Sequence, residues 1–224
     1  MSPFTDPEVV ARYAEGPARQ VPGLQGLQRM AGLLIAEAVP AAGEVLVLGA
    51  GGGLELKAFA ELRPEWRFCG VDPSAEMLSL AERTLGPLVS RVDLHEGYIG
   101  DAPPGPFDAA TCLLTLHFLP EEERRRTVAE VRRRLRPGAP FVVAHHSFPQ
   151  GDGEKSRWLA RYAAFAVASG VPLADAQNAI KAIDDRLPVL SPEQDEAILR
   201  EAGFTDVALF YAGFTFRGWV GYAA

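Results

Sequence analysis

Short apolar runs rich in β-branched residues alternate with amphipathic stretches along this chain. Such alternation is typical of parallel strands joined by helical crossovers. The first run, 44–49, is apolar on both faces, as a central parallel strand must be, and it ends in glycines. The pattern predicts five strands, over 44–49, 66–72, 92–96, 107–113 and 140–144, with helices near 54–62, 74–85 and 121–136.

The helix predicted over 121–136 has clear signals at both ends. Three glutamates occupy its first turn and several arginines its last, which suits the helix dipole, and Pro137-Gly138 ends it. Val128, Val131 and Leu135 form one narrow apolar stripe for docking on the sheet. The arginines are expected to face outward, either as a solvated surface interleaved with acids or as a nucleic-acid patch, and the pattern favours the solvated surface.

Beyond the fifth strand the pattern becomes mainly helical, over 154–187, and this long connection is expected to cap a cleft. Ser191 is predicted to be the N-cap of a helix that begins at Pro192 and runs to Ala202-Gly203. A closing antiparallel hairpin is predicted over 207–210 and 214–222, with 211–213 as its turn.

The first 40 residues are predicted to hold two helical pieces, broken at Gly16-Pro17 and at Pro22-Gly23. They too are expected to fold over the cleft.

Composition narrows the class of protein. The 224 residues, 48% of them apolar, suffice for one domain with a core that needs neither disulfides nor a metal. Cys69 and Cys112 lie in apolar runs, which indicates a reducing cytoplasm. The N-terminus lacks the features of a signal peptide, and Glu37 and Glu44 interrupt the longest apolar window, so no membrane span is expected. The net charge of −7 disfavours nucleic acid as a partner.

A glycine loop follows the first strand and opens the next helix, with the sequence Gly49-Ala50-Gly51-Gly52-Gly53. Glycines there let a ligand approach the backbone closely. Leu54 stands where a dinucleotide fold wants glycine or alanine, and the lysine and hydroxyl of a Walker A loop are missing. Glu55 at the exit of the loop would repel a phosphate, so a neutral or zwitterionic ligand group is expected there.

Asp72 ends the second strand, nineteen residues after Gly53. An acid at this place accepts hydrogen bonds from the ribose hydroxyls of a nucleoside. An aspartate before Pro73-Ser74 is also a common cap or turn residue, and both roles are compatible. Met77, one helical turn later, either points its thioether into the cleft or fills the core.

Five segments occur in an order that resembles the motifs of class I S-adenosylmethionine-dependent methyltransferases: 45–55, 70–78, 97–99, 107–112 and 135–138. The resemblance runs from about residue 44 to 146. Within that superfamily, 19–23 and 114–119 resemble the branch containing the carboxy-S-adenosylmethionine synthase of tRNA wobble-uridine modification. The resemblance implies an α/β fold: a doubly wound, seven-stranded, mostly parallel Rossmann-like sheet with helical caps and a closing antiparallel hairpin.

The resemblance also implies S-adenosylmethionine as cofactor and a set of binding residues. The glycines would flank its methionine part, Asp72 its ribose and Tyr98 and Ile99 its adenine, while Cys112 and Leu113 would line the floor beneath the sulfonium. Further cofactor-binding candidates are Ala50, Pro73, Met77 and Arg19. Two positions depart from the family: Val47 stands where members usually carry an acid that helps to orient the amino-acid end, and Tyr98 where they often carry an aspartate.

The catalytic candidates are histidines near the ends of strands, His117 and His146, because imidazole titrates close to neutral pH. A base is needed only if the methyl acceptor must lose a proton. His145 and His146 are adjacent in an extended segment, so they point to opposite faces and no metal site is expected. Structural or solvent-facing roles stay open for each histidine. Tyr13, Arg19, Trp158 and Tyr162 are candidates for shaping an acceptor pocket.

Three functions are compatible with these features. The first is a cytoplasmic methyltransferase with a small-molecule acceptor, the second an enzyme similar to carboxy-S-adenosylmethionine synthase, and the third a non-catalytic S-adenosylmethionine-binding module. A homodimer stays open. The whole chain, 1–224, is expected to be one domain with four parts: an N-terminal helical cap (1–40), a cofactor-binding core (41–150), a helical insertion (151–190), and a closing helix and hairpin (191–224).

Overall fold

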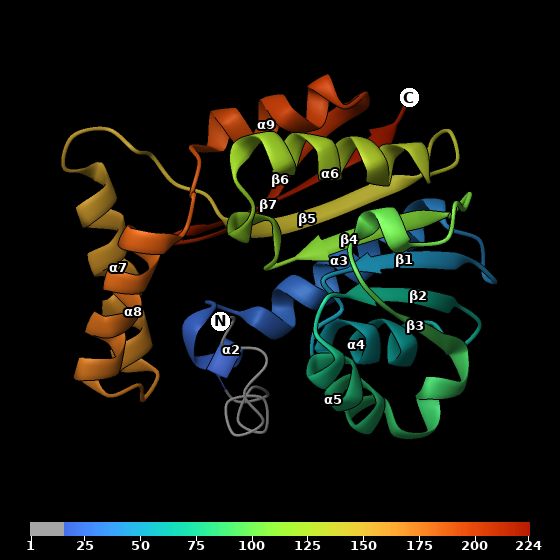
Figure 1. The fold of residues 1–224 in the computed structure, drawn as a ribbon, viewed down its shortest axis with the longest axis horizontal. Coiled ribbons are helices and arrows are strands. Elements are labelled where there is room, and N and C mark those ends of the chain that lie inside the picture. The colour runs from blue at the N-terminus through green and yellow to red at the C-terminus, as the bar shows by residue number, and fades with distance from the viewer. Residues whose placement is uncertain (1–15) are drawn as a thin grey trace.

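A seven-stranded sheet runs through residues 16–224, the part of the chain that the computed structural model describes (Figure 1). The strand order is β3-β2-β1-β4-β5-β7-β6. In this sheet β7 runs opposite to the other six strands. The predicted α/β, mostly parallel architecture is confirmed. The strands are β1 (Glu44–Leu48), β2 (Arg67–Asp72), β3 (Val92–Glu96), β4 (Ala109–Leu113), β5 (Pro140–His146), β6 (Phe204–Gly213) and β7 (Phe216–Ala223).

The strand order reverses between β1 and β4, which lie side by side at the centre of the sheet. From β1 the chain builds outward through β2 and β3, and then returns to place β4 and β5 on the other side. Sheets of this kind bind ligands at such a switch point, beyond the carboxyl ends of the strands. The topology therefore locates a candidate site before any side chain is considered.

Helices cover both faces of the sheet. Alternate residues of β1 point to opposite sides, so that Val45 and Val47 pack in one apolar cluster and Leu46 and Leu48 in another. The first cluster lies under α3 (Leu24–Ala38), α4 (Leu54–Leu62) and α5 (Ala75–Leu85). The second lies under α6 (Glu121–Arg133) and α9 (Pro192–Glu201). Two covered faces explain why β1 is apolar on both sides.

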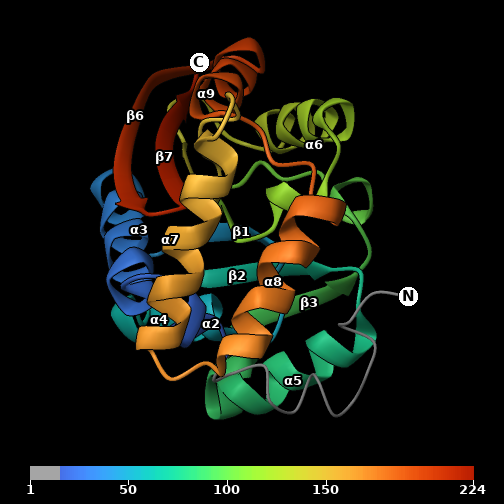
Figure 2. The same cartoon turned by 90° about the vertical axis from the view of Figure 1, so that its left-hand side faces the viewer.

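A helical hairpin of α7 (Glu154–Ala168) and α8 (Leu173–Arg186) stands at the end of the molecule where β5 finishes, and Figure 2 looks onto this end. Small residues pack between its two helices, and Tyr162 of α7 meets the ring of His146 at the end of β5. The short α2 (Gly16–Gln20) lies nearby. Three 3₁₀ turns complete the elements within residues 16–224: Gly86–Arg91, Ile99–Asp101 and Leu116–Phe118. None of the helices in the described range is long and apolar enough to cross a membrane.

Some predicted boundaries were wrong. Tyr211 belongs to β6 and pairs with Gly218 of β7, so the turn of the hairpin lies at Phe214 and Thr215. The hydroxyl of Tyr211 donates to the Pro22 carbonyl oxygen and so ties β6 to the segment before α3.

The predicted end of α6 and the predicted start of β4 were also wrong, and both differences have the same cause. Helix α6 ends at Arg133 because Leu135 leaves it to form a bridge with Phe107, and β4 proper then begins at Ala109. Near the N-terminus the break at Pro22-Gly23 is confirmed, and Gly16 and Pro17 are the first residues of α2. What precedes Gly16 lies outside the described residues, so the predicted break there stays a prediction. The remainder of that N-terminal prediction, including Tyr13, lies outside the described residues.

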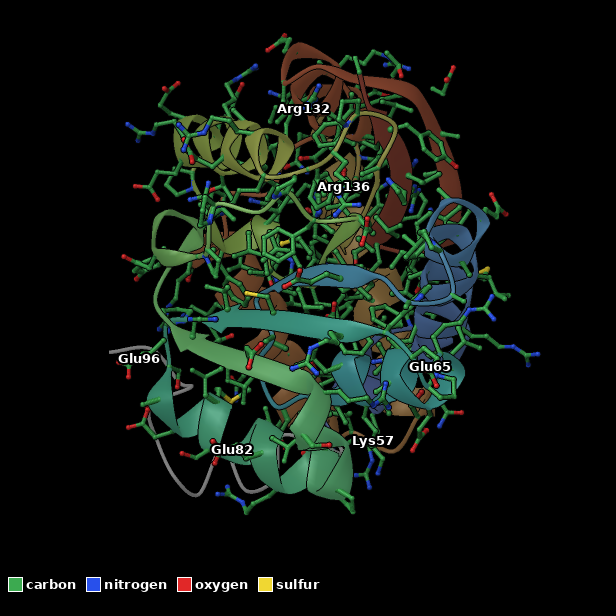
Figure 3. The ribbon with its side chains drawn as sticks, turned by 90° about the vertical axis from the view of Figure 1, so that its right-hand side faces the viewer. Lys57, Glu65, Glu82, Glu96, Arg132 and Arg136 are labelled. Carbon is green, nitrogen blue, oxygen red and sulfur yellow. The ribbon has the colours of Figure 1, made fainter. Side chains whose placement is uncertain are left out.

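Most arginines of α6 and the turn after it pair with acids. Arg125 contacts Glu121 and Glu201, Arg133 and Arg134 both contact Glu130, and Arg136 contacts Asp108. Figure 3 shows the end of the molecule opposite the α7–α8 hairpin, where Arg132 and Arg136 lie. This neutralised surface supports a solvent-facing role over a nucleic-acid patch.

Two arginines do not face outward as predicted: Arg134 is only 6% exposed, and Arg124 is only 1% exposed. Arg124 forms a buried ion pair with Asp195 of α9 and donates to the carbonyl oxygens of Leu119 and Pro188. Nε2 of His145 lies 3.2 Å from the same carboxylate. Although burial raises the pKa of Asp195, His145 and Arg124 lower it overall. The pair joins α6, α9 and the segment that leads out of the hairpin.

Replacing Asp195 by alanine leaves Arg124 buried without its carboxylate. We expect the Asp195→Ala variant to lose about 3–5 kcal/mol of unfolding free energy, the usual cost of breaking a buried pair. Urea unfolding measures this. Glu196→Ala on the same helix is the matched control, because its pair with Arg200 is solvent-exposed and contributes about 1 kcal/mol or less. Equal losses in the two variants would show that the buried pair does not stabilise this junction.

Candidate functional site

The glycine loop adopts conformations that suit glycine alone. Gly49, Gly51 and Gly53 have φ angles of 74°, 49° and 80°. A Cβ built on Gly49 would lie 2.1 Å from Oγ1 of Thr115, and one on Gly53 would lie 2.9 Å from the backbone of Ala81. The N–H groups of Gly49 and Ala50 donate to the Val71 carbonyl oxygen at 2.8 and 3.0 Å. The loop is therefore fixed against the end of β2.

Asp72 connects this loop to the next strand and helix. Its Oδ2 accepts from the Gly51 N–H at 2.9 Å, and its Oδ1 accepts from the Ser74 N–H at 3.0 Å. Burial raises the pKa of Asp72, against the effect of these two hydrogen bonds. Each carboxylate oxygen accepts more than one hydrogen bond, so acceptor capacity remains for two hydroxyl groups of a ligand.

The cap of α5 is Ser74, whose Oγ accepts from the Met77 N–H at 3.2 Å. Asp72 instead accepts from the Ser74 N–H in the turn before α5. Of the cap and turn roles predicted for Asp72, the structure therefore shows the turn role. Met77 is buried, 3% exposed, and Pro73 is exposed.

The segment after β3 presents the residues assigned to the adenine. Tyr98 is 65% exposed and its N–H donates to Asp101 at 2.9 Å, while Ile99 is buried. The Gly97 N–H donates to the Asp72 carbonyl oxygen at 3.0 Å, which brings this segment to the end of β2. Arg19 is an exposed residue of α2.

Cys112 and Leu113 do not share one surface. Cys112 packs in the cluster under α6 and α9, and Leu113 in the cluster on the opposite face of the sheet. Burial raises the pKa of the Cys112 thiol, and the nearby Glu55 raises it further. The two residues thus point to opposite faces of the sheet, and their predicted place beneath the sulfonium stays a prediction.

His117 and His146 meet in a buried cluster beyond β4 and β5. Their ring centroids are 4.8 Å apart, and Nδ1 of His117 accepts from the His146 backbone N–H at 3.3 Å. The His146 ring stacks on Phe216 at 4.0 Å, and its Nδ1 lies 3.0 Å from Oγ1 of Thr215. As predicted, His145 points to the other face, toward Asp195.

Both rings are neutral at neutral pH. Burial lowers the pKa of His146 to about 3, with the nearby His145 adding to the effect. Burial, together with His146, His145 and Arg124, holds the pKa of His117 well below its usual range. A base so weak accepts a proton poorly from a substrate at neutral pH. In the part of the chain that the structure describes, no three His, Cys, Asp or Glu side chains gather as a metal site.

Aromatic and basic side chains from the α7–α8 hairpin and β7 adjoin the histidines. Tyr162 contacts the His146 ring, and burial raises the pKa of its hydroxyl to about 12. The guanidinium groups of Arg161 and Arg217 each lie over the Trp158 ring, 4.4 and 5.1 Å from its centroid. These contacts join α7 to β7 beside the end of β5.

The sequence analysis missed one pair beside the glycine loop. Glu55, in the first turn of α4, is buried, and its Oε1 accepts from the Thr111 hydroxyl of β4 at 2.6 Å. A glutamate so close to the loop was noted as a repulsive charge, but its burial depends on the packing of α4 against β4. The sequence around Glu55 contains no signal that predicts this packing.

The family model described as a methyltransferase domain matches residues 45–138. This part of the chain is similar to methyltransferase domains. It contains the glycine loop, Asp72 and the segment of Tyr98, so the residues that meet at the switch point belong to the matched region.

Relatives that match nearly the whole chain carry one name. The carboxy-S-adenosyl-L-methionine synthase of Chromohalobacter salexigens is 29% identical over 97% of this chain and 82% of its own length. The protein of the same name from Actinobacillus succinogenes is 26% identical over 95% of this chain and 90% of its own length. The likeness to these relatives thus extends beyond residues 45–138 on both sides.

Solved structures share the fold. A putative O-methyltransferase from Nostoc punctiforme superposes with a TM-score of 0.69 at 18% identity, covering 96% of this chain and 60% of its own. Human N-acetylserotonin methyltransferase, solved in complex with S-adenosylmethionine, gives a TM-score of 0.64 at 15% identity, covering 99% and 57%. The chain thus spans about three fifths of the length of these proteins, and the likeness establishes the fold.

The depressed pKa of His146 predicts a loss of stability in acid. Unfolding restores its pKa to about 6.5, so the unfolded chain binds the extra proton and stability falls as the pH drops below 6.5 toward 3. The slope is about 1.4 kcal/mol per pH unit. We expect wild type to lose about 2 kcal/mol between pH 7 and 5 relative to a His146→Phe variant, which keeps the stacking. Urea unfolding at both pH values tests this, and parallel stabilities would contradict it.

Proposed function

We propose that this chain is an S-adenosylmethionine-dependent methyltransferase with a small-molecule acceptor. The observation that carries the proposal is the hydrogen bond between Asp72 and the Gly51 N–H, because it unites the glycine loop and a ribose-binding acid at one place. The match to the methyltransferase domain covers both residues.

The residues at the switch point suit this cofactor. Asp72 has acceptor capacity for the two ribose hydroxyls, and the loop after β1 offers backbone without side chains at Gly51 and Gly53. We propose that Tyr98 and Ile99 edge the adenine, and that Ala50, Pro73, Met77, Leu113 and Arg19 contribute further cofactor contacts.

When bound, S-adenosylmethionine supplies an electrophilic methyl group on a sulfonium, whose leaving group is neutral. The protein then has to orient the acceptor and exclude water. His117 and His146, both neutral and buried, are candidates to hold the acceptor by hydrogen bonds, not to remove a proton from it. We propose that α2 and the α7–α8 hairpin, which adjoins the end of β5, cap the acceptor side and keep water out of it.

Several features favour a small molecule as acceptor. The chain carries a net charge of −7, and the arginines of α6 are largely paired with acids. Tyr162 and Trp158 give the acceptor side an aromatic character. The free, buried thiols of Cys69 and Cys112 accord with a cytoplasmic enzyme.

Carboxy-S-adenosylmethionine synthesis is the second candidate, favoured by the names of the two relatives that match almost the full chain. Mass spectrometry of the nucleoside that copurifies with the protein separates the two. A carboxylated sulfonium nucleoside identifies the second candidate, and S-adenosylmethionine or S-adenosylhomocysteine the first.

Replacing Asp72 by alanine removes the ribose acceptor and the tether of the glycine loop together. We expect the Kd for S-adenosylhomocysteine, measured by calorimetry, to rise at least tenfold, which is about 1.4 kcal/mol. Asp93→Ala is the matched control, since it removes the same charge from an exposed position of β3 and leaves the Kd unchanged. An unchanged Kd in Asp72→Ala would remove Asp72 from the site.

A further inference from the structure

Glu55 is a buried acid at the exit of the glycine loop. It is the second residue of α4, two positions after Gly53, and it is only 7% exposed. Charged carboxylates are rarely buried without a cationic partner or several hydrogen bonds, because losing hydration is costly. The described part of the chain offers this carboxyl no cation.

One neighbour holds Glu55 in place. The Thr111 hydroxyl donates to Oε1 at 2.6 Å, and the sheet register sets Thr111 directly beside Val47 of β1. The carboxyl therefore lies next to the strand that leads into the glycine loop. Within residues 16–224, no group donates a hydrogen bond to the second oxygen, Oε2. Thr111 thus fixes one carboxyl oxygen of Glu55, and the other oxygen can accept a hydrogen bond from a ligand.

Burial raises the pKa of Glu55 to about 8, although the Thr111 hydrogen bond lowers it. The carboxyl is consequently protonated in most molecules at pH 7 when no ligand is bound. Cys112 of β4 is the titratable group coupled to it electrostatically, and that thiol is neutral at this pH because burial raises its pKa above the usual value. A cation brought to Oε2 would favour the ionised form and expel the proton.

We propose that Glu55 binds the ammonium group at the amino-acid end of S-adenosylmethionine and releases its proton when the cofactor binds. This rests on the proposed function. The inference identifies Glu55 as a cofactor-binding residue, and it makes cofactor affinity dependent on pH. Below pH 8 the affinity falls with decreasing pH, because the proton competes with the ammonium group for the same carboxyl.

Calorimetry in two buffers measures the number of protons that the protein releases when the ligand binds. S-adenosylhomocysteine, which has the same amino-acid end, is titrated into the protein at pH 7 in phosphate and in Tris, two buffers that differ in ionisation enthalpy. A pKa of about 8 predicts release of about 0.9 proton per site. The Glu55→Gln variant keeps an acceptor for Thr111 but has no proton to lose, so its release falls to the contribution of the ligand alone.

A second ligand separates binding of the amino-acid end from binding of the nucleoside. 5′-Deoxy-5′-methylthioadenosine lacks the amino-acid end. We expect Glu55→Gln to raise the Kd for S-adenosylhomocysteine at least tenfold at pH 8.5 and to leave the Kd for methylthioadenosine unchanged. Thermal unfolding confirms that the variant is folded, and unchanged binding of methylthioadenosine confirms an intact nucleoside site.

The outcomes are distinct. If wild type binds neither ligand, the proposed function fails and the role of Glu55 with it. If both bind but wild type and Glu55→Gln release the same number of protons, Glu55 is a protonated structural acid or donates to the cofactor carboxylate, and the inference is wrong. Equal weakening of both ligands by Glu55→Gln also overturns it, since the effect is then on the loop as a whole.

Discussion

The hydrogen bond from the Gly51 N–H to the Asp72 carboxylate joins the ends of two neighbouring strands, and the geometry of the site depends on it. A second bond from Ser74 places the same carboxylate at the start of α5, and the Gly97 N–H reaches the Asp72 carbonyl oxygen from the segment after β3. One residue thus sets the positions of the glycine loop, of α5 and of the segment that begins at Gly97 relative to one another. Its carboxylate is preorganised for a ligand because backbone groups, and no mobile side chain, hold it.

The sheet also divides polar chemistry between its two faces. On one face of β5, His145 joins Asp195 and Arg124 in a buried network that ties α6 to α9. On the other, His146 meets His117 and Tyr162 under the α7–α8 hairpin. Adjacent residues of one strand therefore serve stability and the candidate acceptor side separately. The low pKa of His146 follows from the apolar packing that shapes this side, so shape and proton affinity are linked.

Much of this arrangement could be predicted from local sequence. The doubly apolar β1, the glycines after it, Asp72 at the end of β2 and the Ser191 cap of α9 are all confirmed in position, because each depends on near neighbours in the chain. Contacts between distant elements could not be predicted. The buried Arg124 pairs with Asp195 of another helix, and Glu55 is held by Thr111 of β4. The extent of β6 depends on its pairing with β7. Where family resemblance expects an acid at Val47, this chain has a carboxyl from α4 beside the neighbouring strand.

A crystal structure of the protein with S-adenosylhomocysteine tests the central claim most directly. The account predicts the ribose hydroxyls within hydrogen-bond distance of Asp72, and the thioether facing the carboxyl ends of β4 and β5. An empty crevice at the switch point, or the nucleoside bound elsewhere on the molecule, would contradict it.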